Sequence, residues 1–372
     1  MIHSLDGGGA ERVMAGLASR LAERDHRVTL ILLGDRSSRH DVSARVTVIP
    51  LDCLATPTRR GWIGQRWRRL RTAIARGDRA GKSFDAVLSF CDWTNVMTLA
   101  AAWGMDIPVL VAERSNPMLQ TMGRPKEWLR RRLYKRARRV ICLSDDVAEY
   151  LAKTTGANTL VIHSAVDGPP ESDGRAAECN GPSSSSSDSQ VLRIVAMGRL
   201  EFEKGFDRLL EALAGMDPGM RDWRLTLLGD GSLRTQLQDR ARHLGLDHRI
   251  NMPGWVRPIW QELDGCDLFV LPSRYEGFPS ALLEAMSAGL ACVSVDLGGA
   301  TDAIIRHGTN AWRVGNTVPE LTEGLSKIMA DDKLRRRLAK NAVEVKTRFG
   351  WPSMVDAYEQ VLKDEVNSDG NR

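Results

Sequence analysis

Short runs of Val, Ile and Leu alternate along the chain with segments in which apolar residues recur every three or four positions. The short runs are almost continuously apolar, which is typical of strands buried on both faces of a parallel sheet. We expect strands at 2–5, 28–33, 46–49, 86–90, 109–112, 140–143, 160–163, 192–197, 224–229, 250–252, 268–271, 292–295 and 311–314. Helical patterns between them include 10–24, 206–213, 233–244 and 281–288. This alternation predicts an α/β protein with two doubly wound, Rossmann-like domains.

A compositional break separates the two halves of the chain. Residues 168–190 hold prolines, glycines and a run of five serines, with no apolar periodicity, so we expect a linker or insertion there. The predicted domains are 1–167 and 191–350. The last helical pattern, 352–366, is not placed by its periodicity, and we expect it to pack back on the first domain. Only Met1 to Leu5 precede the first glycines, so we expect a short first strand or a natural start a few residues upstream.

Length and composition exclude several classes of protein. With 372 residues, 42% hydrophobic and 27% charged, the chain resembles a two-domain globular protein and not a disordered or collagen-like one. No apolar run is long enough to span a bilayer, and the first residues lack the basic and apolar regions of a secretory signal. Six cysteines without a Cys-x-x-Cys pair suggest reduced thiols, so we expect a cytoplasmic protein.

The net charge of +5 is unevenly distributed. Residues 59–82 and 124–139 each contain nine basic residues and one acid, which leaves 34 basic and 45 acidic residues in the rest of the chain. Apolar and aromatic residues interrupt both stretches, a pattern of amphipathic basic helices suited to an anionic membrane surface. Two alternatives remain open: ordinary surface helices with solvated arginines, and a nucleic-acid surface. The candidate membrane residues are Arg59, Arg60, Trp62, Arg66, Trp67, Arg68, Arg69, Arg130, Arg131 and Arg132.

A glycine-rich loop, Gly7-Gly8-Gly9-Ala10-Glu11-Arg12, lies between the first predicted strand and helix. Without side chains there, backbone amides and the helix dipole can approach an anion. A dinucleotide site would need Gly-x-Gly-x-x-Gly, and here Gly7, Gly9 and the acid Asp35 match while Arg12 replaces the third glycine. A plain strand-to-helix turn is the alternative.

Three further elements follow strands of the second half. Gly198-Arg199-Leu200 ends one strand and Lys204 follows before a helix, so that two cations can neutralise a departing diphosphate. Gly229 ends the next strand, where a ligand can approach the backbone. Glu276 follows a third strand, and Glu284, eight residues later, is expected two turns into the next helix. Such a pair can hold hydroxyls of two sugar-like groups, although solvated surface glutamates are the alternative.

Together, these elements resemble the signatures of family 4 glycosyltransferases, which are retaining nucleotide-sugar transferases of the GT-B fold. The matching motifs are Glu-x7-Glu at 276–284, Gly-Arg-Leu…Lys-Gly at 198–205 and Gly-Gly-Ala-Glu-Arg at 8–12, and the resemblance runs from residue 7 to about 330. It implies two Rossmann-like domains with the active site in a cleft between them. It further implies catalytic roles for Arg199, Lys204 and Glu276, with Arg199 and Lys204 on the donor diphosphate, Glu284 on the ribose and Glu276 on the transferred sugar. The other implied donor contacts are Gly8, Gly9, Gly229, Trp255, Val256, Gly277, Phe278, Pro279 and Ser280.

Within this family, 89–95 and 113–117 look most like transferases that add galactose or N-acetylgalactosamine to undecaprenyl-diphosphate-linked saccharides. The implied acceptor or sugar contacts are Asp92, Asn95, Glu113, Arg114 and Asn116. Several relatives have Glu-His-Ser-Asn where this chain has Glu113-Arg114-Ser115-Asn116, so a histidine contact to the sugar is not carried over. Loop and cap chemistry is the alternative for Glu113 and Asn116. In the same relatives a basic helix near 62–76 faces the lipid diphosphate.

Metal chemistry is not indicated. The chain has no Asp-x-Asp element, and its seven histidines show no His-x3-His spacing, so we expect no obligatory metal. The resulting hypothesis is a retaining glycosyltransferase that moves a hexose or N-acetylhexosamine from a nucleotide sugar, expected to be UDP-linked, to a lipid-linked or polysaccharide-precursor acceptor. It would act in cell-surface glycan synthesis, at the inner face of the plasma membrane. The rivals are an NAD-dependent oxidoreductase and a non-catalytic adaptor that binds anionic lipid or nucleic acid; the sugar, linkage and oligomeric state are not predicted.

Overall fold

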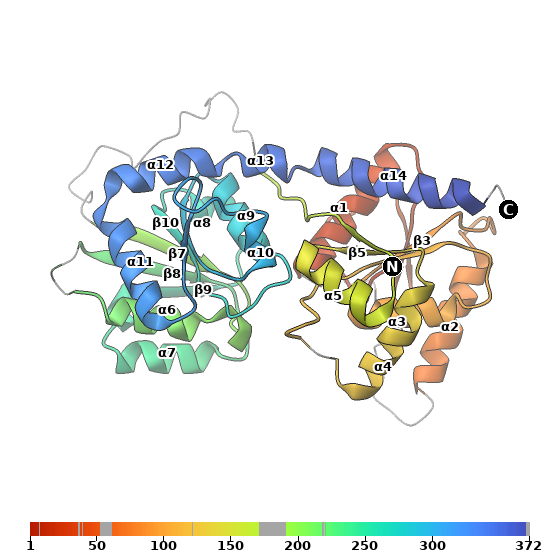
Figure 1. The fold of residues 1–372 in the computed structure, drawn as a ribbon, viewed down its shortest axis with the longest axis horizontal. Coiled ribbons are helices and arrows are strands. Elements are labelled where there is room, and N and C mark those ends of the chain that lie inside the picture. The colour runs from red at the N-terminus through yellow and green to blue at the C-terminus, as the bar shows by residue number, and fades with distance from the viewer. Residues whose placement is uncertain are drawn as a thin grey trace. The chain divides into compact units, whose positions relative to one another are not determined.

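The computed structural model describes residues 1–369 apart from 7, 36, 37, 39, 53–61, 121, 171–190, 218 and 220. The chain folds into two compact units. Unit 1 comprises residues 1–165 together with the helix that begins at Trp351, and unit 2 comprises residues 166–350. Each unit is a parallel sheet with helices packed on it (Figure 1). The two predicted doubly wound domains are therefore confirmed.

The sheet of unit 1 is built from two parallel groups of strands. β1 and β2 pair with each other, and β3 to β6 form a second sheet in chain order. The bounds are Thr29–Leu32 for β1, Thr47–Pro50 for β2, Val87–Phe90 for β3, Val109–Ala112 for β4, Arg139–Cys142 for β5 and Thr159–Val161 for β6.

The first five residues run between the two groups. The Ile2 amide donates to the Ile31 carbonyl at 3.3 Å, and the Phe90 amide donates to the Met1 carbonyl at 3.0 Å. The predicted strand at 2–5 is thus present only as isolated bridges, at Ile2 and Leu5, although its backbone is hydrogen-bonded to β1 and β3.

Helices cover both faces of this sheet because its strands alternate between two hydrophobic clusters. In β4, Leu110 packs in the cluster that contains α1 and α14, while Val111 packs in the cluster of α2 to α5. The helices are α1 Gly9–Glu23, α2 Trp62–Arg76, α3 Asp92–Ala101, α4 Arg124–Leu133, α5 Asp145–Thr155 and α14 Trp351–Asp369, and a 3-10 turn, η1, spans Tyr134–Arg136.

The C-terminal helix α14 belongs to unit 1 through both apolar and charged contacts. Trp351 packs against Gly16 and beneath the Arg20 guanidinium, whose carbon lies 4.0 Å from the ring centroid, and Tyr358 is fully buried. Glu359 accepts hydrogen bonds from Lys363, Arg24 and His26, which lower its pKa to about 2. Figure 1 shows α14 beside α1, which this helix contacts.

Unit 2 contains one six-stranded parallel sheet in the order β12-β11-β10-β7-β8-β9. The strands are β7 Leu192–Met197, β8 Trp223–Leu228, β9 Ile250–Gly254, β10 Leu268–Leu271, β11 Ala291–Val295 and β12 Trp312–Val314. The helices are α6 Phe206–Ala214, α7 Arg234–His243, α8 Trp260–Leu263, α9 Ser280–Ser287, α10 Gly299–Asp302, α11 Val318–Ala330, α12 Asp332–Ala342 and α13 Val345–Arg348, with 3-10 turns η2 Phe202–Lys204 and η3 Asp247–Arg249. This is the strand order of a dinucleotide-binding Rossmann sheet.

Two of the general predictions, reduced cysteines and no helix that spans a bilayer, concern the described part of the chain. Cys91, Cys142, Cys266 and Cys292 are free thiols, whereas Cys53 and Cys179 lie outside the described residues. Among the helices that the structure describes, none combines the length and the apolarity that crossing a bilayer requires.

Candidate active site

The candidate site of unit 2 lies where the chain changes direction across the sheet. β7 has β8 on one side and β10 on the other, and successive strands are added outward from this point. In a parallel sheet, the loops that leave two adjacent strands at such a switch point diverge and leave room for a ligand. The loop after β7 carries Arg199 and Lys204, and the loop after β10 carries Glu276. The fold thus brings together residues that are more than 70 positions apart in sequence.

Lys204 and Glu276 form a direct ion pair. The Lys204 Nζ donates to Glu276 Oε1 at 2.6 Å, and the Ser273 hydroxyl donates to the same oxygen at 2.7 Å. The two charged side chains are only 17% and 10% exposed, so water screens their attraction less than at an open surface. The Glu276 carboxylate is thereby the anionic partner of Lys204 in this structure.

Arg199 is held differently from Lys204. Its side chain is 71% exposed and donates to Glu203 Oε1 at 2.7 Å. An exposed ion pair of this kind contributes little free energy to stability. The guanidinium can therefore exchange its partner for a phosphate with a small loss of free energy.

Arg274, which the sequence analysis did not single out, ties the two loops together. Its guanidinium donates to both carboxylate oxygens of Asp207 at 2.8 and 2.7 Å and to the Phe202 carbonyl at 2.8 Å. Although burial opposes it, this bonding with Arg274 lowers the pKa of Asp207. Nothing in the spacing of Arg274 and Asp207 marks them as partners, because their contact depends on β7 and β10 being neighbours.

Two glycines permit the close approach of the strand ends. Gly205 has a φ of 64°, and a Cβ there would lie 2.2 Å from the Pro272 carbonyl oxygen. Gly229 has a φ of 136°, and its Cβ would lie 2.0 Å from the Gly198 carbonyl oxygen. A side chain at Gly205 would push the loop of Lys204 away from the loop of Glu276, and a side chain at Gly229 would push the end of β8 away from the end of β7.

The remaining predicted donor contacts follow β9 and β10. Gly277 and Ser280 are half-buried, whereas Phe278 and Pro279 are buried, with the Phe278 ring 5.8 Å from that of Phe349. Helix α9 begins at Ser280, so the half-buried Glu284 lies one turn into the helix and not two. That part of the prediction was wrong by one turn.

Trp255 and Val256 follow β9, at the same carboxyl edge as Gly229. The Gly229 amide donates to the Gly254 carbonyl at 2.7 Å, which holds the end of β8 beside the end of β9. Trp255 is 45% exposed, and the Arg257 guanidinium carbon lies 5.3 Å from its ring centroid.

The glycine-rich loop of unit 1 opens helix α1. Gly8 is the N-cap and Gly9 the first helical residue, while Gly7 lies outside the described residues. The Glu11 carboxylate folds back over Gly8, so closely that a Cβ at Gly8 would meet it at 2.1 Å, and His3 Nε2 lies 3.3 Å from Glu11 Oε1. Asp35, the acid of the dinucleotide alternative, follows β1.

The predicted acceptor residues of unit 1 divide into an accessible and an inaccessible group. Asp92 is partly exposed; Arg114 is partly exposed as a residue, but Nε and Nη1 of its guanidinium are buried. Asn95 and Glu113 are 0% exposed, so we correct the expectation that their side chains contact a sugar: both bond within the protein. Asn116 is 6% exposed, and its Oδ1 accepts from the Met118 amide at 3.0 Å, which is the loop chemistry considered as its alternative.

Glu113 and Arg114 are the two residues that follow β4, and their side chains lie on opposite sides of the backbone. The Arg114 guanidinium carbon is 5.2 Å from the Phe90 ring centroid, and its Nη2 donates to the Ser164 hydroxyl. Burial lowers the pKa of Arg114, since few groups around it compensate the charge.

The basic stretches contain one clear exception to the predicted membrane surface. Arg130 is fully buried, so its guanidinium cannot reach a lipid headgroup in this structure, and its assignment to the membrane surface was wrong. Arg68, Arg69, Arg131 and Arg132 are exposed, whereas Arg66 and Trp67 are half-buried. Arg59 and Arg60 lie outside the described residues, as does the side chain of Trp62.

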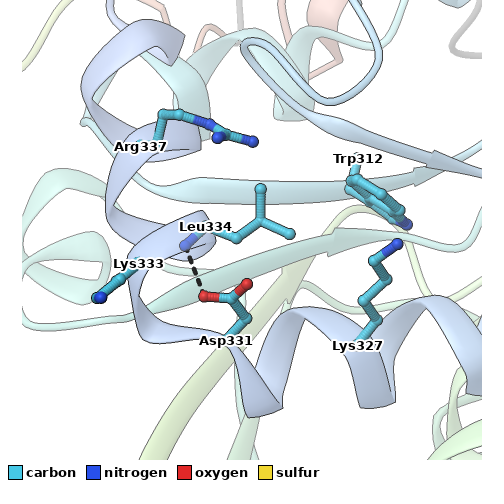
Figure 2. Close-up of a pocket in the computed structure, with 6 residues that line it drawn as sticks. All are labelled: Trp312, Lys327, Asp331, Lys333, Leu334 and Arg337. Carbon is cyan, nitrogen blue, oxygen red and sulfur yellow. Dashed lines mark hydrogen bonds between the residues drawn. The ribbon is translucent and has the colours of Figure 1, made fainter.

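A separate depression of about 410 Å³ opens on unit 2, away from these loops. Figure 2 shows that it is lined by Trp312, Lys327, Asp331, Lys333, Leu334 and Arg337. Its Asp331 caps α12 by accepting from the Leu334 amide at 2.9 Å, and Lys327 Nζ lies 4.4 Å from the Trp312 ring centroid. No predicted site residue lines it. Within the described ranges, no group of three or more His, Cys, Asp or Glu side chains is arranged to hold a metal ion.

Comparison with known families assigns each half of the chain to a described domain. Residues 7–168 match the model of Glycosyltransferase Family 4, and residues 182–345 match that of Glycosyl transferases group 1. The two matches follow each other in the order of the two structural units.

Two curated proteins and one solved structure illustrate the similarity. The chain is 26% identical over 92% of its length, and 91% of the relative's, to the GalNAc-α-(1→4)-GalNAc-α-(1→3)-diNAcBac-PP-undecaprenol α-1,4-N-acetyl-D-galactosaminyltransferase of Campylobacter jejuni. It is 34% identical over 47% of its length to an exopolysaccharide phosphotransferase of Streptomyces coelicolor, of which it spans only 19%. The crystal structure of Anabaena HepE in complex with UDP and glucose aligns with a TM-score of 0.74 at 20% identity, covering 97% of this chain and 98% of HepE.

Proposed function

The chain is a glycosyltransferase of the GT-B fold, with a family 4 domain followed by a group 1 domain, and on this basis we propose that it transfers a sugar with retention from a UDP-sugar to a lipid-linked or polysaccharide-precursor acceptor. The transferred sugar is a hexose or an N-acetylhexosamine. The UDP donor is supported by the fold shared with HepE, whose structure holds UDP and glucose. The lipid-linked acceptor is supported by the Campylobacter relative, which acts on an undecaprenol-PP-linked saccharide.

The observation that carries this proposal is the ion pair between Lys204 and Glu276 at the switch point of unit 2. Lys204 Nζ and Glu276 Oε1 are 2.6 Å apart, and the pair lies where a doubly wound sheet binds its ligand. A donor diphosphate would displace the carboxylate from Lys204. Glu276 would then be released toward the sugar, and one binding event would place both charges.

The chemistry assigned to the site is electrostatic. Lys204 and Arg199 neutralise the negative charge that develops on the departing diphosphate, while Glu276 accepts hydrogen bonds from sugar hydroxyls and Glu284 from the ribose. Gly8, Gly9, Gly229, Trp255, Val256 and residues 277–280 complete the proposed donor site. The acceptor hydroxyl passes its proton to a diphosphate oxygen as the new glycosidic bond forms on the face from which the diphosphate leaves.

We assign the acceptor to unit 1, with Asp92, Arg114 and the loop around Asn116 as its contacts. Arg114 lies next to this loop, and its guanidinium suits a phosphate-bearing or otherwise anionic acceptor that reaches the now buried Nε and Nη1. The exchange of histidine for Arg114 relative to the family pattern therefore changes the kind of group that this position can recognise.

We further propose that unit 1 binds an anionic membrane at the inner face of the plasma membrane. The two basic stretches meet at Trp103: Arg71 of α2 donates to its carbonyl at 2.8 Å, and the Arg136 guanidinium carbon lies 3.6 Å from its ring centroid. Large apolar side chains are exposed in unit 1, namely Trp103 at 55%, Met118 at 38%, Leu119 at 59% and Trp128 at 57%, and arginine side chains lie over the rings of Trp103 and Trp128. Exposed indoles among arginines are typical of a surface that enters the lipid headgroup region.

The transferase proposal is tested by nucleotide release. UDP- and GDP-sugars are screened for thermal stabilisation of the protein and for release of nucleotide on addition of detergent-solubilised undecaprenyl-diphosphate saccharides. We expect acceptor-dependent UDP release, reduced at least about 100-fold in Lys204→Met because a charge contact to the leaving group is lost. Lys340→Met, an exposed lysine of α12, is the matched control and should keep wild-type rates. Near-normal turnover of Lys204→Met would remove the role assigned to Lys204.

The membrane proposal is tested by sedimentation with vesicles of neutral lipid alone and with added anionic lipid, over a salt series. Binding should need the anionic lipid, weaken with salt and fall in the Trp103→Ser/Trp128→Ser double variant. Phe202→Ser removes an aromatic side chain that is 61% exposed in unit 2 and should not alter binding. Equal binding to nucleic acid, or no dependence on anionic lipid, would contradict the proposal.

A further inference from the structure

A buried polar network joins helix α4 to the loop that follows β4. Its members are Arg130 of α4, Tyr134 of η1, Asn95 of α3 and Glu113 at the end of β4, and all four are 0% exposed. Because they have no access to solvent, they do not contact an acceptor directly. Their burial needs another explanation, since removing charges from water is costly unless they are paired.

Glu113 is the centre of the network. Its Oε2 accepts from the Tyr134 hydroxyl at 2.9 Å and lies 3.8 Å from Arg130 Nη1. Its Oε1 accepts from the hydroxyl of Ser115 at 2.8 Å and from the Ser115 amide at 3.3 Å. The carboxylate thus folds back on its own loop and fixes the backbone two residues ahead.

The other end of the network lies on the basic helix. Arg130 Nη2 donates to Glu127 Oε1 at 2.7 Å, and Asn95 donates to the Tyr134 hydroxyl at 3.3 Å and to the Ala112 carbonyl at 2.9 Å. Burial lowers the pKa of Arg130, but Glu113 and Glu127 outweigh it and the pKa is raised. The arginine therefore keeps its charge inside unit 1.

The two ends serve different parts of the proposed reaction. Residues next to Arg130 on α4, such as Arg131 and Trp128, are exposed and belong to the proposed membrane surface. Arg114 and Asn116, which lie next to Glu113 in the same loop, belong to the proposed acceptor site. An extended chain directs successive side chains to opposite faces, so Glu113 can turn toward α4 while Arg114 turns toward Phe90.

We propose that Glu113, Tyr134 and Arg130 are positioning residues. They hold the 113–120 loop in a fixed position relative to helix α4, which faces the proposed membrane. The network sets where the acceptor loop lies relative to the lipid surface, and so at what height a lipid-linked saccharide is presented. This inference rests on the proposed function, and it assigns no contact with substrate to these three residues.

The most informative variant is Tyr134→Phe, which removes the hydroxyl donor to Glu113 but keeps the ring that fills the core. We expect the KM for the lipid-linked acceptor to rise about tenfold, equivalent to about 1.4 kcal/mol, while the KM for the UDP-sugar stays unchanged. Glu113→Gln should act in the same direction. Tyr150→Phe and Glu149→Gln, at positions of α5 outside the network, are the matched controls.

A second measurement does not depend on activity. Amide hydrogen exchange of residues 115–120 should become faster in Tyr134→Phe, and exchange in unit 2 should not change. A lowered melting temperature with unchanged acceptor KM and unchanged loop exchange would reduce the network to a structural role and overturn the inference. If the wild-type enzyme transfers to no lipid-linked acceptor, the proposed function fails, and loop exchange alone then decides whether the network positions the loop.

Discussion

Gly205 offers the sharpest test of how the candidate donor site is assembled. The change Gly205→Ala introduces a Cβ that would lie 2.2 Å from the Pro272 carbonyl oxygen, in a residue with a φ of 64°. A non-glycine residue in this left-handed conformation costs about 1 kcal/mol, and overpacking a rigid contact adds about 1–3 kcal/mol. We therefore expect unit 2 to lose about 2–4 kcal/mol of stability.

The assay is equilibrium denaturation in urea, followed by hydrogen exchange in unit 2, with Gly245→Ala as the control. Gly245 has a φ of 71°, but nothing lies within 4 Å of the position of its Cβ. This control measures the conformational cost alone, and it should lose only about 1 kcal/mol. The folded Gly205→Ala protein should also bind the UDP-sugar more weakly, because relief of the clash separates the loops of Lys204 and Glu276. Equal destabilisation by the two variants would refute the inferred contact between the loops.

Three further outcomes are expected, each from a named contact. Because hydrogen bonds from its basic partners lower the pKa of Glu359 to about 2 from its ordinary 4.5, the stability that it contributes is complete above pH 4.5 and is lost as the pH falls toward 2. The difference in melting temperature between wild type and Glu359→Gln should therefore shrink over that interval, and a constant difference would contradict this assignment. Arg274→Lys cannot keep both bonds to Asp207, whose side chain is 33% exposed, so we expect a loss of about 1 kcal/mol in urea unfolding and a higher KM for the donor. Thr317→Ala breaks the capping box with Glu320 and should cost about 1 kcal/mol in the same assay, whereas unchanged stability would show that the cap is not needed to hold α11.

The sequence predicted the elements of the fold well where local patterns are sufficient. The strands at 109–112, 192–197 and 268–271 match β4, β7 and β10 to the residue, because a short apolar run bounded by polar residues is a local signal. Helix α9 begins at Ser280, one residue before the predicted start at 281, and Glu284 lies one turn after this start, where two turns were expected. The segment at 2–5 has strand character, but it bonds to its neighbours too sparsely to form a regular strand.

The basic stretches show where local patterns fail. A run of arginines indicates a charged helix, but it does not say which arginine faces inward. Arg130 does so because Glu113 at the end of β4 and Glu127 one turn earlier in α4 provide carboxylates for it inside unit 1. Glu113 and Asn95 were assigned to the acceptor from the family resemblance, which carries over positions in a motif but does not show that both side chains are buried here.

Periodicity and motif spacing are properties of neighbouring residues, so the α/β class, the two doubly wound domains and the cations and carboxylates of the donor motifs could be predicted from the sequence. The folded chain then settles which of these groups meet. It placed Glu276 on Lys204, Arg274 on Asp207 and Arg130 beside Glu113, in each case across elements that are distant along the chain. The physical reason is that hydrogen bonds and ion pairs act over a few ångströms, and the order of strands in a sheet, which no local pattern contains, sets which loops come that close.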